Sequence, residues 1–297
     1  LTSFGDMLRV PGTRESLQET RSRGGRVQVV YSPVDAVNLA VKNPQMQVVF
    51  FAVGFETTAP ATALAVLQAW ERKLDNFSLL TAHVRVQPAM EAILRSERNR
   101  VQAFLAAGHV CTVTGFDCYR ELARRHGVPI AVTGFEPSDL LAGILCCVEQ
   151  LEAGRSDVIN CYPRAVTSSG NTTAQAMVDR VYEISDQHWR GLGIVNHGGL
   201  RLRSDFAQFD ARKRFRNVEP AGGNLRTVIH SENSAAENAD DVRCRAAEVL
   251  SGVLRPVDCP EFGKGCTPDS PLGAPMVSGE GACAAYFQYG MSCPVLK

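Results

Sequence analysis

The sequence has no net charge, no long apolar run and no signal peptide. Its 297 residues include 31 basic and 31 acidic side chains, so the formal net charge is zero. A neutral chain presents no large electrostatic surface for nucleic acid or anionic lipid. No apolar run approaches the roughly 18 residues that a membrane span requires, and no charged-then-apolar leader opens the sequence. We therefore expect a soluble, cytoplasmic protein with neither nucleic acid nor membrane as a partner.

The usual motifs of nucleotide-binding proteins and serine hydrolases are also missing. No G-x-G-x-x-G follows a strand-like segment, and neither G-x-x-x-x-G-K-S/T nor G-x-S-x-G occurs. These motifs build phosphate-binding turns and nucleophile elbows. A stand-alone α/β enzyme acting on a small molecule therefore stays only as an alternative, because no recognised nucleophile, base or cofactor loop supports it.

Cysteine, in contrast, is abundant, and four of the ten cysteines lie in a tail rich in Gly and Pro. Cys244, Cys259, Cys266 and Cys283 are separated by 14, 6 and 16 residues. Thiolates are soft ligands that favour zinc or an iron-sulfur cluster, and a metal centre stabilises a region whose own core is small. Zinc modules usually contain close C-x2-4-C pairs, whereas the shortest gap here is six residues. The spacing favours an iron-sulfur cluster, with a structural zinc site as the alternative.

We expect the remaining cysteines to be reduced and structural, because a chain of this length does not depend on disulfides for its core. Cys146 and Cys147 lie in a segment of helical period whose apolar face we predict to be buried. That face comprises Leu140, Leu141, Ile144, Leu145, Val148 and Leu151. Cys111, Cys118 and Cys161 are single residues near apolar segments, and Cys293 follows no readable pattern.

Upstream of the tail, short apolar runs alternate with helix-like segments. We predict strands at 26–31, 47–53, 78–82, 109–114 and 129–133, and helices at 89–107 and 118–126. Apolar strands that alternate with helices imply a parallel sheet covered on both faces. The predicted fold is α/β, with two similar doubly wound parallel-sheet domains plus a small Cys-rich iron-sulfur region. The predicted boundaries are 1–107 for the first domain, 108–215 for the second and 216–297 for the cluster region.

The tripeptide Gly-Phe-Glu occurs twice, 80 positions apart, each time at the end of a predicted strand. Such recurrence indicates two similar units. Open α/β sheets bind ligands at the carboxyl ends of their strands, so two such loops facing each other predict a polar, acid-lined cleft between the domains. The residues that we assign to this cleft or to a partner-binding surface are Gly54, Glu56, Thr57, Thr58, His83, Gly134, Glu136, Pro137 and Asp139.

These assignments have structural alternatives. Each Glu can complete a helix cap and favour the helix dipole, with Thr57, Thr58 or Ser138 as further caps, and Asp139 can strengthen the first turn of its helix. His83 is either a ligand or proton carrier in the cleft or a solvated loop histidine.

Six longer motifs carry a resemblance to a known family. The segments FGDMLRVPG, GFETTAPATA, GFEPSDLL, HWRGLG, CPEFGKGCTP and EGACAAY run from Phe4 to about Tyr289, and they resemble the HypD family of hydrogenase maturation factors. The resemblance implies a redox-active assembly scaffold rather than a stand-alone enzyme. It also implies that Cys244, Cys259, Cys266 and Cys283 bind a [4Fe-4S] cluster for electron supply. The implied partners are a HypC-type chaperone and a HypE-type cyanide donor, and the implied product is the Fe(CN)2(CO) unit of [NiFe]-hydrogenase.

The chain departs from the family pattern at its start. Family members begin earlier, with cysteine-bearing segments that include a GPGCPVC-like stretch, and no such stretch precedes Leu1. Because the first residue is not Met, we expect an N-terminal segment to be missing. The family's iron-handling thiols go with that segment, so the sequence identifies no catalytic residue.

Overall fold

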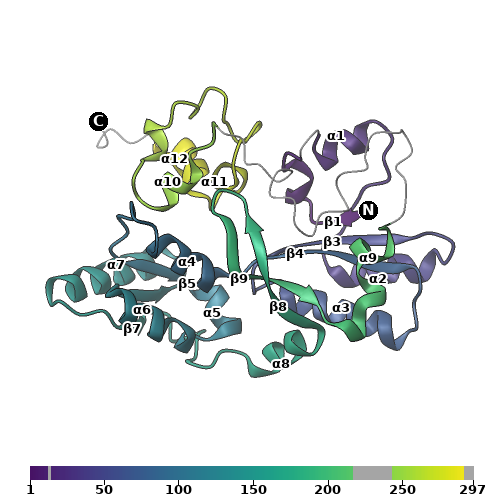
Figure 1. Cartoon of the computed structure of the whole chain (residues 1–297), viewed down its shortest axis with the longest axis horizontal. Coiled ribbons are helices and arrows are strands. Elements are labelled where there is room, and N and C mark those ends of the chain that lie inside the picture. The colour runs from purple at the N-terminus through teal and green to yellow at the C-terminus, as the bar shows by residue number, and fades with distance from the viewer. Residues whose placement is uncertain (13–14, 217–242, 291–297) are drawn as a thin grey trace.

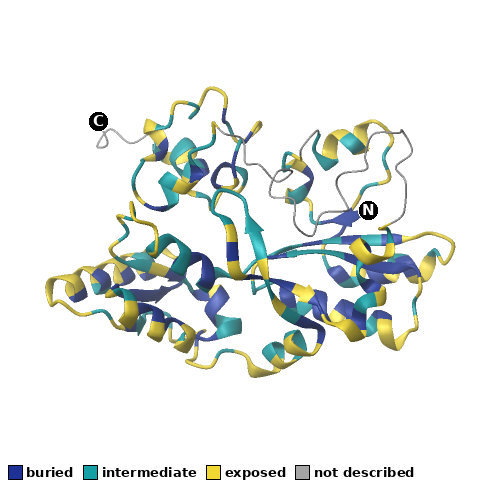
Figure 2. Cartoon of the chain, viewed as in Figure 1, coloured by how far each residue is buried: buried dark blue, intermediate teal, exposed yellow. Residues whose placement is uncertain are grey.

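The computed structural model describes residues 1–12, 15–216 and 243–290 of the chain (Figure 1). Two α/β lobes lie on either side of a long β-hairpin, and a small region made from the tail lies above the hairpin in this view. Buried residues concentrate in the strands of both lobes and in the helix faces that cover them (Figure 2). No described helix is long and apolar enough to span a bilayer.

The first lobe is built on a four-stranded parallel sheet of order β2-β1-β3-β4. The strands are β1 (Thr2–Ser3), β2 (Gln28–Val29), β3 (Val48–Gly54) and β4 (Phe77–His83). The helices are η1 (Asp6–Arg9), α1 (Leu17–Ser22), α2 (Pro33–Lys42) and α3 (Ala59–Glu71). A capping box between Ser32 and Asp35, with Pro33 in the first turn, starts α2. Three of the predicted strands, 26–31, 47–53 and 78–82, are confirmed.

The second lobe contains a three-stranded parallel sheet of order β5-β6-β7. Its strands are β5 (Phe104–Ala107), β6 (Ile130–Thr133) and β7 (Val158–Asn160). The accompanying helices are α4 (Val86–Leu94), α5 (Gly108–Thr114), η2 (Asp117–Tyr119), α6 (Arg120–His126) and α7 (Pro137–Glu152). Parallel sheets covered by helices confirm the predicted α/β class.

Two predicted elements of the second lobe are wrong. The segment predicted as a helix at 89–107 is helical only as far as Leu94, and its C-terminal end forms strand β5. The segment predicted as a strand at 109–114 is helix α5. Local propensity misled both predictions, because β5 has the composition FLAA and α5 contains β-branched residues. Pairing with β6 makes β5 a strand. At Gly108, an added Cβ would lie 2.5 Å from the Thr133 carbonyl oxygen, so the chain turns there against the neighbouring strand.

The segment after β7 returns to the first lobe. It contains α8 (Thr172–Val181), the antiparallel hairpin β8 (Tyr182–Trp189) and β9 (Gly193–Leu202), η3 (Ser204–Phe209) and α9 (Ala211–Arg214). Tyr182, Leu202 and Phe209 are buried in the core of the first lobe. The packing therefore differs from the boundaries predicted above in two places, since 181–209 joins the first core and β5 joins the second sheet.

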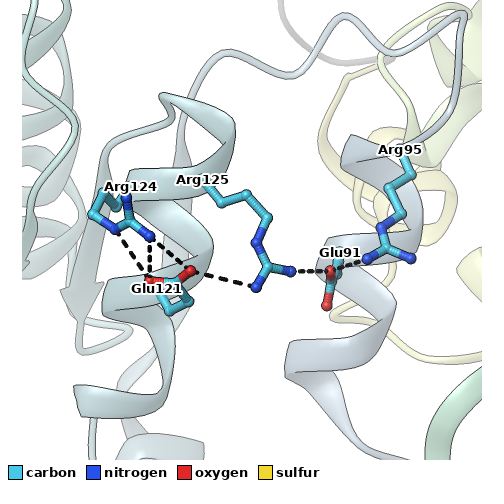
Figure 3. Close-up of polar contacts among 5 residues, drawn as sticks. All are labelled: Glu91, Arg95, Glu121, Arg124 and Arg125. Carbon is cyan, nitrogen blue, oxygen red and sulfur yellow. Dashed lines mark hydrogen bonds and ion pairs between the residues drawn. The ribbon is translucent and has the colours of Figure 1, made fainter.

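Surface ion pairs join α4 to α6 in the second lobe. Arg125 of α6 lies between Glu121 of its own helix and Glu91 of α4, with a nitrogen to oxygen distance of 3.0 Å to Glu91 (Figure 3). Arg95 and Arg124 extend the network at its two ends. Exposed pairs of this kind contribute little singly, but a network shares the entropy cost of ordering the side chains.

Helix α7 packs on its sheet through a face that the sequence did not predict. The buried residues are Asp139, Gly143, Cys147 and Gln150, which recur at helical spacing. The predicted apolar face is exposed instead, with Leu141 at 67% and Leu145 at 58%. Helical periodicity identifies a stripe but does not decide which stripe faces the sheet. The small residue Gly143 allows the helix to approach the strands closely.

We expect Gly143→Ala to lower the free energy of unfolding by about 1–2 kcal/mol, because overpacking outweighs the gain in helix propensity. The added Cβ would lie 2.2 Å from Thr133 Cγ2, on a β-branched side chain that cannot move away. Urea titration measures the effect. The control Leu145→Ala should change stability by less than about 0.5 kcal/mol. A larger cost for Leu145→Ala than for Gly143→Ala would place the apolar stripe in the core after all.

Candidate functional site

The four tail cysteines line one pocket. Between residues 243 and 290 the tail contains only short helices, α10 (Ala246–Leu250), η4 (Pro256–Asp258), α11 (Ala274–Val277) and α12 (Ala282–Tyr289). Cys244, Cys259, Cys266 and Cys283 come from four separate places in this region and line the same pocket. The rest of the lining is mainly apolar and includes Val249, Phe262, Leu272, Pro275 and Met276.

Local backbone geometry holds the pocket open around the thiols. The Leu272 amide donates a hydrogen bond to Cys266 Sγ at 3.3 Å. Gly273 leaves room for another thiol, because an added Cβ would lie 2.2 Å from Cys244 Sγ. A turn at Gly263, with φ of 69°, brings Cys259 and Cys266 back toward each other. Phe262 and Phe287 pack edge to face beside the pocket at 5.8 Å.

The thiols interact electrostatically. Burial raises the pKa of Cys283 to about 11, and the neighbouring thiolates of Cys266, Cys244 and Cys259 add to the shift. Four thiolates in one apolar pocket therefore repel each other unless a cation lies among them. A bound metal centre supplies that positive charge and holds coordinating thiols in the deprotonated form.

Four cysteine thiols are a donor set for either a structural zinc ion or a [4Fe-4S] cluster. A tetrahedral zinc ion with Zn–S bonds of about 2.3 Å holds its sulfurs about 3.8 Å apart. Within residues 1–12, 15–216 and 243–290, no group of three His, Cys, Asp or Glu side chains is placed to hold one metal ion. The role of the four cysteines as cluster ligands stays a prediction.

The tail docks on the hairpin and on the loop after α4. The HWRGLG motif forms the hairpin turn. Gly191 in that turn lies against Ala246 of α10, since a Cβ added at Gly191 would lie 2.9 Å from Ala246 Cβ. The Arg100 amide donates to the Ser251 carbonyl at 2.9 Å, and Arg98 pairs with Glu248 at 3.7 Å. These contacts fix the tail to the hairpin and to the second lobe, beside which it lies in Figure 1.

The first Gly-Phe-Glu loop follows β3 and does not cap its own helix. Gly54 has φ of 142°, so it makes the sharp exit that the sequence predicted. Thr58 is the N-cap residue of α3, but its hydroxyl donates to the Phe55 carbonyl instead of capping the helix. Glu56 Oε1 accepts a hydrogen bond from the Val86 amide at 3.0 Å, at the start of α4. The capping alternative for Glu56 is therefore wrong for α3, since its carboxylate accepts from a first-turn amide of α4 instead.

The other carboxylate oxygen of Glu56 is unusual. Glu56 Oε2 is buried and has no hydrogen-bond partner among the described residues. Burial raises the pKa of Glu56 above its ordinary value, against the opposing hydrogen bond from Val86 and the charge of Arg85. Burial raises the pKa of Cys118 in the second lobe to about 11, and the negative charge of Glu56 adds to this shift. Glu56 thus lies where the two lobes meet.

The second Gly-Phe-Glu loop is held by an arginine that the sequence analysis missed. Arg164 donates to both carboxylate oxygens of Asp139, at 2.9 and 2.6 Å, and pairs with Glu136 at 3.3 Å. Its guanidinium lies over the Tyr162 ring at 4.4 Å. Hydrogen bonds and charge from Arg164 lower the pKa of Asp139. An added Cβ at Gly134 would lie 2.0 Å from Asp139 Oδ2, so this glycine makes room for the clamped carboxylate.

The two loops therefore differ in detail. Glu136 is the N-cap residue of α7 without a side-chain cap, and Pro137 occupies the first turn. Across the described part of the chain, no hydrogen bond or ion pair joins Glu56 to Glu136. The acid-lined cleft stays a prediction, with one acid buried between the lobes and the other paired within its own lobe. No sequence pattern marked Arg164, because its partners lie 25 and 28 residues away.

His83 is not a solvated loop histidine, because its side chain is fully buried at the end of β4. Nε2 lies 3.4 Å from Thr62 Oγ1, and Tyr182 donates its hydroxyl hydrogen to the same oxygen at 2.9 Å. The rings of His83 and Tyr182 pack edge to face at 5.7 Å. Nδ1 has no hydrogen-bond partner in the described structure. Burial lowers the pKa of His83 to about 4, so the ring is neutral at physiological pH.

Comparison with known proteins places the whole chain in one family. The HypD family model, described as the hydrogenase formation hypA family, matches residues 1–290. The hydrogenase maturation factor HypD of Rhodobacter capsulatus is 44% identical over 289 residues, which cover 97% of this chain and 74% of the relative. The factor from Azotobacter vinelandii is 44% identical over 297 residues, which cover 98% of this chain and 74% of the relative. The factor from Escherichia coli is 43% identical over 288 residues, which cover 97% of this chain and 73% of the relative. The chain therefore belongs to the HypD family of hydrogenase maturation factors.

Proposed function

We propose that this hydrogenase maturation factor is a redox-active scaffold for assembly of the Fe(CN)2(CO) unit of [NiFe]-hydrogenase. In this proposal it acts with a HypC-type chaperone and a HypE-type cyanide donor, and a [4Fe-4S] cluster held by Cys244, Cys259, Cys266 and Cys283 supplies electrons. The supporting observation is that four cysteines, far apart in the tail, line one apolar pocket. The family membership gives the biological context.

The residues around the pocket have separate tasks in the proposal. The cysteines hold the cluster, which supplies one-electron transfer when bound. The Leu272 amide, already directed at Cys266 Sγ, stabilises charge on that sulfur, and hydrogen bonds to sulfur are one way in which proteins set a cluster potential. Met276, Phe262 and Phe287 limit the access of water.

The two Gly-Phe-Glu loops form the surface where iron and its ligands are handled. Glu56 has the stronger physical case for a chemical role, because a half-buried carboxylate with a raised pKa and an unpartnered oxygen can accept or release a proton more readily than an exposed one. Glu136 and Asp139 are held by Arg164 and suit a docking surface better than proton transfer. Gly54, Thr57, Thr58, Gly134 and Pro137 shape the loops that present these acids.

Elemental analysis and electron paramagnetic resonance of the protein purified without oxygen test this function. We expect about four iron atoms and matching labile sulfide per chain, with absorbance near 400 nm. Zinc in place of iron and sulfide would refute the electron-supply role and favour the structural alternative.

Replacing Glu56 with Gln is expected to reduce iron retained with the HypC-type partner several-fold, because the amide cannot exchange the proton that a buried carboxylate can. The matched variant Glu136→Gln keeps a hydrogen-bond acceptor for Arg164 and should have the smaller effect. Co-purification of the partner and iron content per complex measure both. If neither value changes in either variant, the loop acids have no part in iron handling.

A further inference from the structure

Three cysteines that are not assigned to the cluster meet in the second lobe. Cys146 and Cys147 are neighbours on α7, and Cys161 follows β7 directly. All three are free thiols. Cys147 is buried, with its thiol 3.7 Å from the Phe104 carbonyl oxygen, as predicted for a core residue. Cys146 and Cys161 are partly exposed, so the core interpretation does not extend to them.

Several contacts place Cys146 and Cys161 on segments that pack together. The buried Gln150 donates to Cys146 Sγ at 3.7 Å and accepts from the Asp157 amide at 2.7 Å, which ties α7 to the segment that enters β7. The Cys161 amide donates to the Val132 carbonyl at 2.9 Å and extends the β6–β7 ladder under α7. The two residues are close enough that Cys146 acts on the pKa of the Cys161 thiol.

We propose that Cys146 and Cys161 form an oxidisable dithiol that reacts with low-molecular-weight disulfides to cross-link α7 to the loop after β7. One thiolate attacks the small disulfide and releases one small thiol, which leaves a mixed disulfide on the protein. The second cysteine then attacks that mixed disulfide and releases the second small thiol. In the balanced reaction the two protein thiols are oxidised to one disulfide and the small disulfide is reduced to two thiols.

The surroundings permit this reaction and make it slow at neutral pH. Among the residues that the structure describes, the three thiols do not form a group that could hold a metal ion. Cys146 and Cys161 are each partly exposed, whereas Cys147 is buried. Burial and the neighbouring Cys146 raise the pKa of Cys161 to about 11, so little thiolate is present at neutral pH. Two thiols whose thiolates are not stabilised form a disulfide slowly. Once formed, that disulfide is only a weak oxidant, so it persists.

The cross-link would act on the second Gly-Phe-Glu loop. Cys161 lies three residues before Arg164, and Cys146 lies on the helix whose first turn carries Asp139. The Arg164–Asp139 ion pair already joins these two segments. A covalent bond between them would keep the loop in place when that ion pair opens, so oxidation would lock the conformation of this loop.

Peptide mapping of the full chain tests the proposal. Trypsin cleaves after Arg125, Arg155 and Arg164, which places Cys146 and Cys147 in peptide 126–155 and Cys161 alone in peptide 156–164. After incubation with excess oxidised glutathione at pH 8, we expect mass spectrometry to show these two peptides joined by a disulfide. The cross-link should disappear in Cys146→Ser and in Cys161→Ser and persist in Cys147→Ser.

Two further outcomes separate the proposal from chance oxidation. Cross-linking should accelerate by up to tenfold per pH unit between pH 7 and 9, because attack requires thiolate. Peptides that stay unlinked, each alkylated or each carrying its own glutathione, would overturn the proposal. A cross-link that survives in Cys146→Ser but is lost in Cys147→Ser would overturn it as well, because the pair would then be a different one.

Discussion

Replacing Cys266 with serine is expected to remove most of the iron and labile sulfide from protein purified without oxygen. Cys266 is the buried member of the four tail cysteines, and its sulfur already accepts a hydrogen bond from the Leu272 amide. A serine hydroxyl at this place has a far higher pKa than a thiol and is a poor ligand for iron. With one of four ligands lost, we expect iron content to fall from about four atoms to less than one per chain.

The loss should extend to the fold of the tail. The region has only short helices and a small core around Met276, so a bound metal centre would contribute much of its folding free energy. Faster proteolysis within 243–290 should therefore accompany the loss of iron. The control is Cys118→Ser, which removes a thiol from the second lobe and should leave iron and sulfide unchanged. Normal iron content in Cys266→Ser, with sulfide retained, would show that the pocket does not hold the cluster.

Stability should fall steeply with acid because of His83. The folded protein depresses the pKa of this buried ring from 6.5 to about 4. The unfolded chain therefore binds a proton that the folded chain does not bind between these two pH values, and the free energy of unfolding falls as the pH is lowered through this window. A shift of this size corresponds to about 3 kcal/mol, lost between about pH 6.5 and 4.

Urea titrations at a series of pH values test this assignment. In His83→Gln the ring that titrates is gone, so the variant should lose about 3 kcal/mol less than the wild type between pH 7 and 4. Glu56 has the opposite effect on the pH dependence of stability. Its pKa is raised in the folded protein, so the free energy of unfolding falls as the pH rises through the range where the carboxyl of the unfolded chain ionises. The comparison between variant and wild type cancels that contribution. His109→Gln, which removes a surface imidazole, should follow the wild-type curve. Parallel curves for His83→Gln and the wild type would exclude His83 as the source.

The sequence predicted the structure correctly where the signal was local. The strands at 47–53 and 129–133 are apolar runs bounded by turn residues, and both form. It failed at 89–114, where a helix former stands in a strand and β-branched residues stand in a helix. There the pairing of β5 with β6 overrides the preference of each segment. Predictions that touch 217–242, including part of the cluster region, and Cys293 lie outside the described residues.

The features of the candidate site also divide into those that follow from residue order and those that follow from packing. The positions of the tail cysteines, the repeated Gly-Phe-Glu tripeptide and the α/β rhythm depend only on residue order, so the sequence by itself determined them. The sheet-facing side of α7, the clamp on Asp139 by Arg164, the burial of His83 and the approach of Cys161 to Cys146 were decided by tertiary structure alone. Each of these depends on which distant segments pack together, and packing fixes burial, charge pairing and proton affinity in ways that spacing along the chain does not contain.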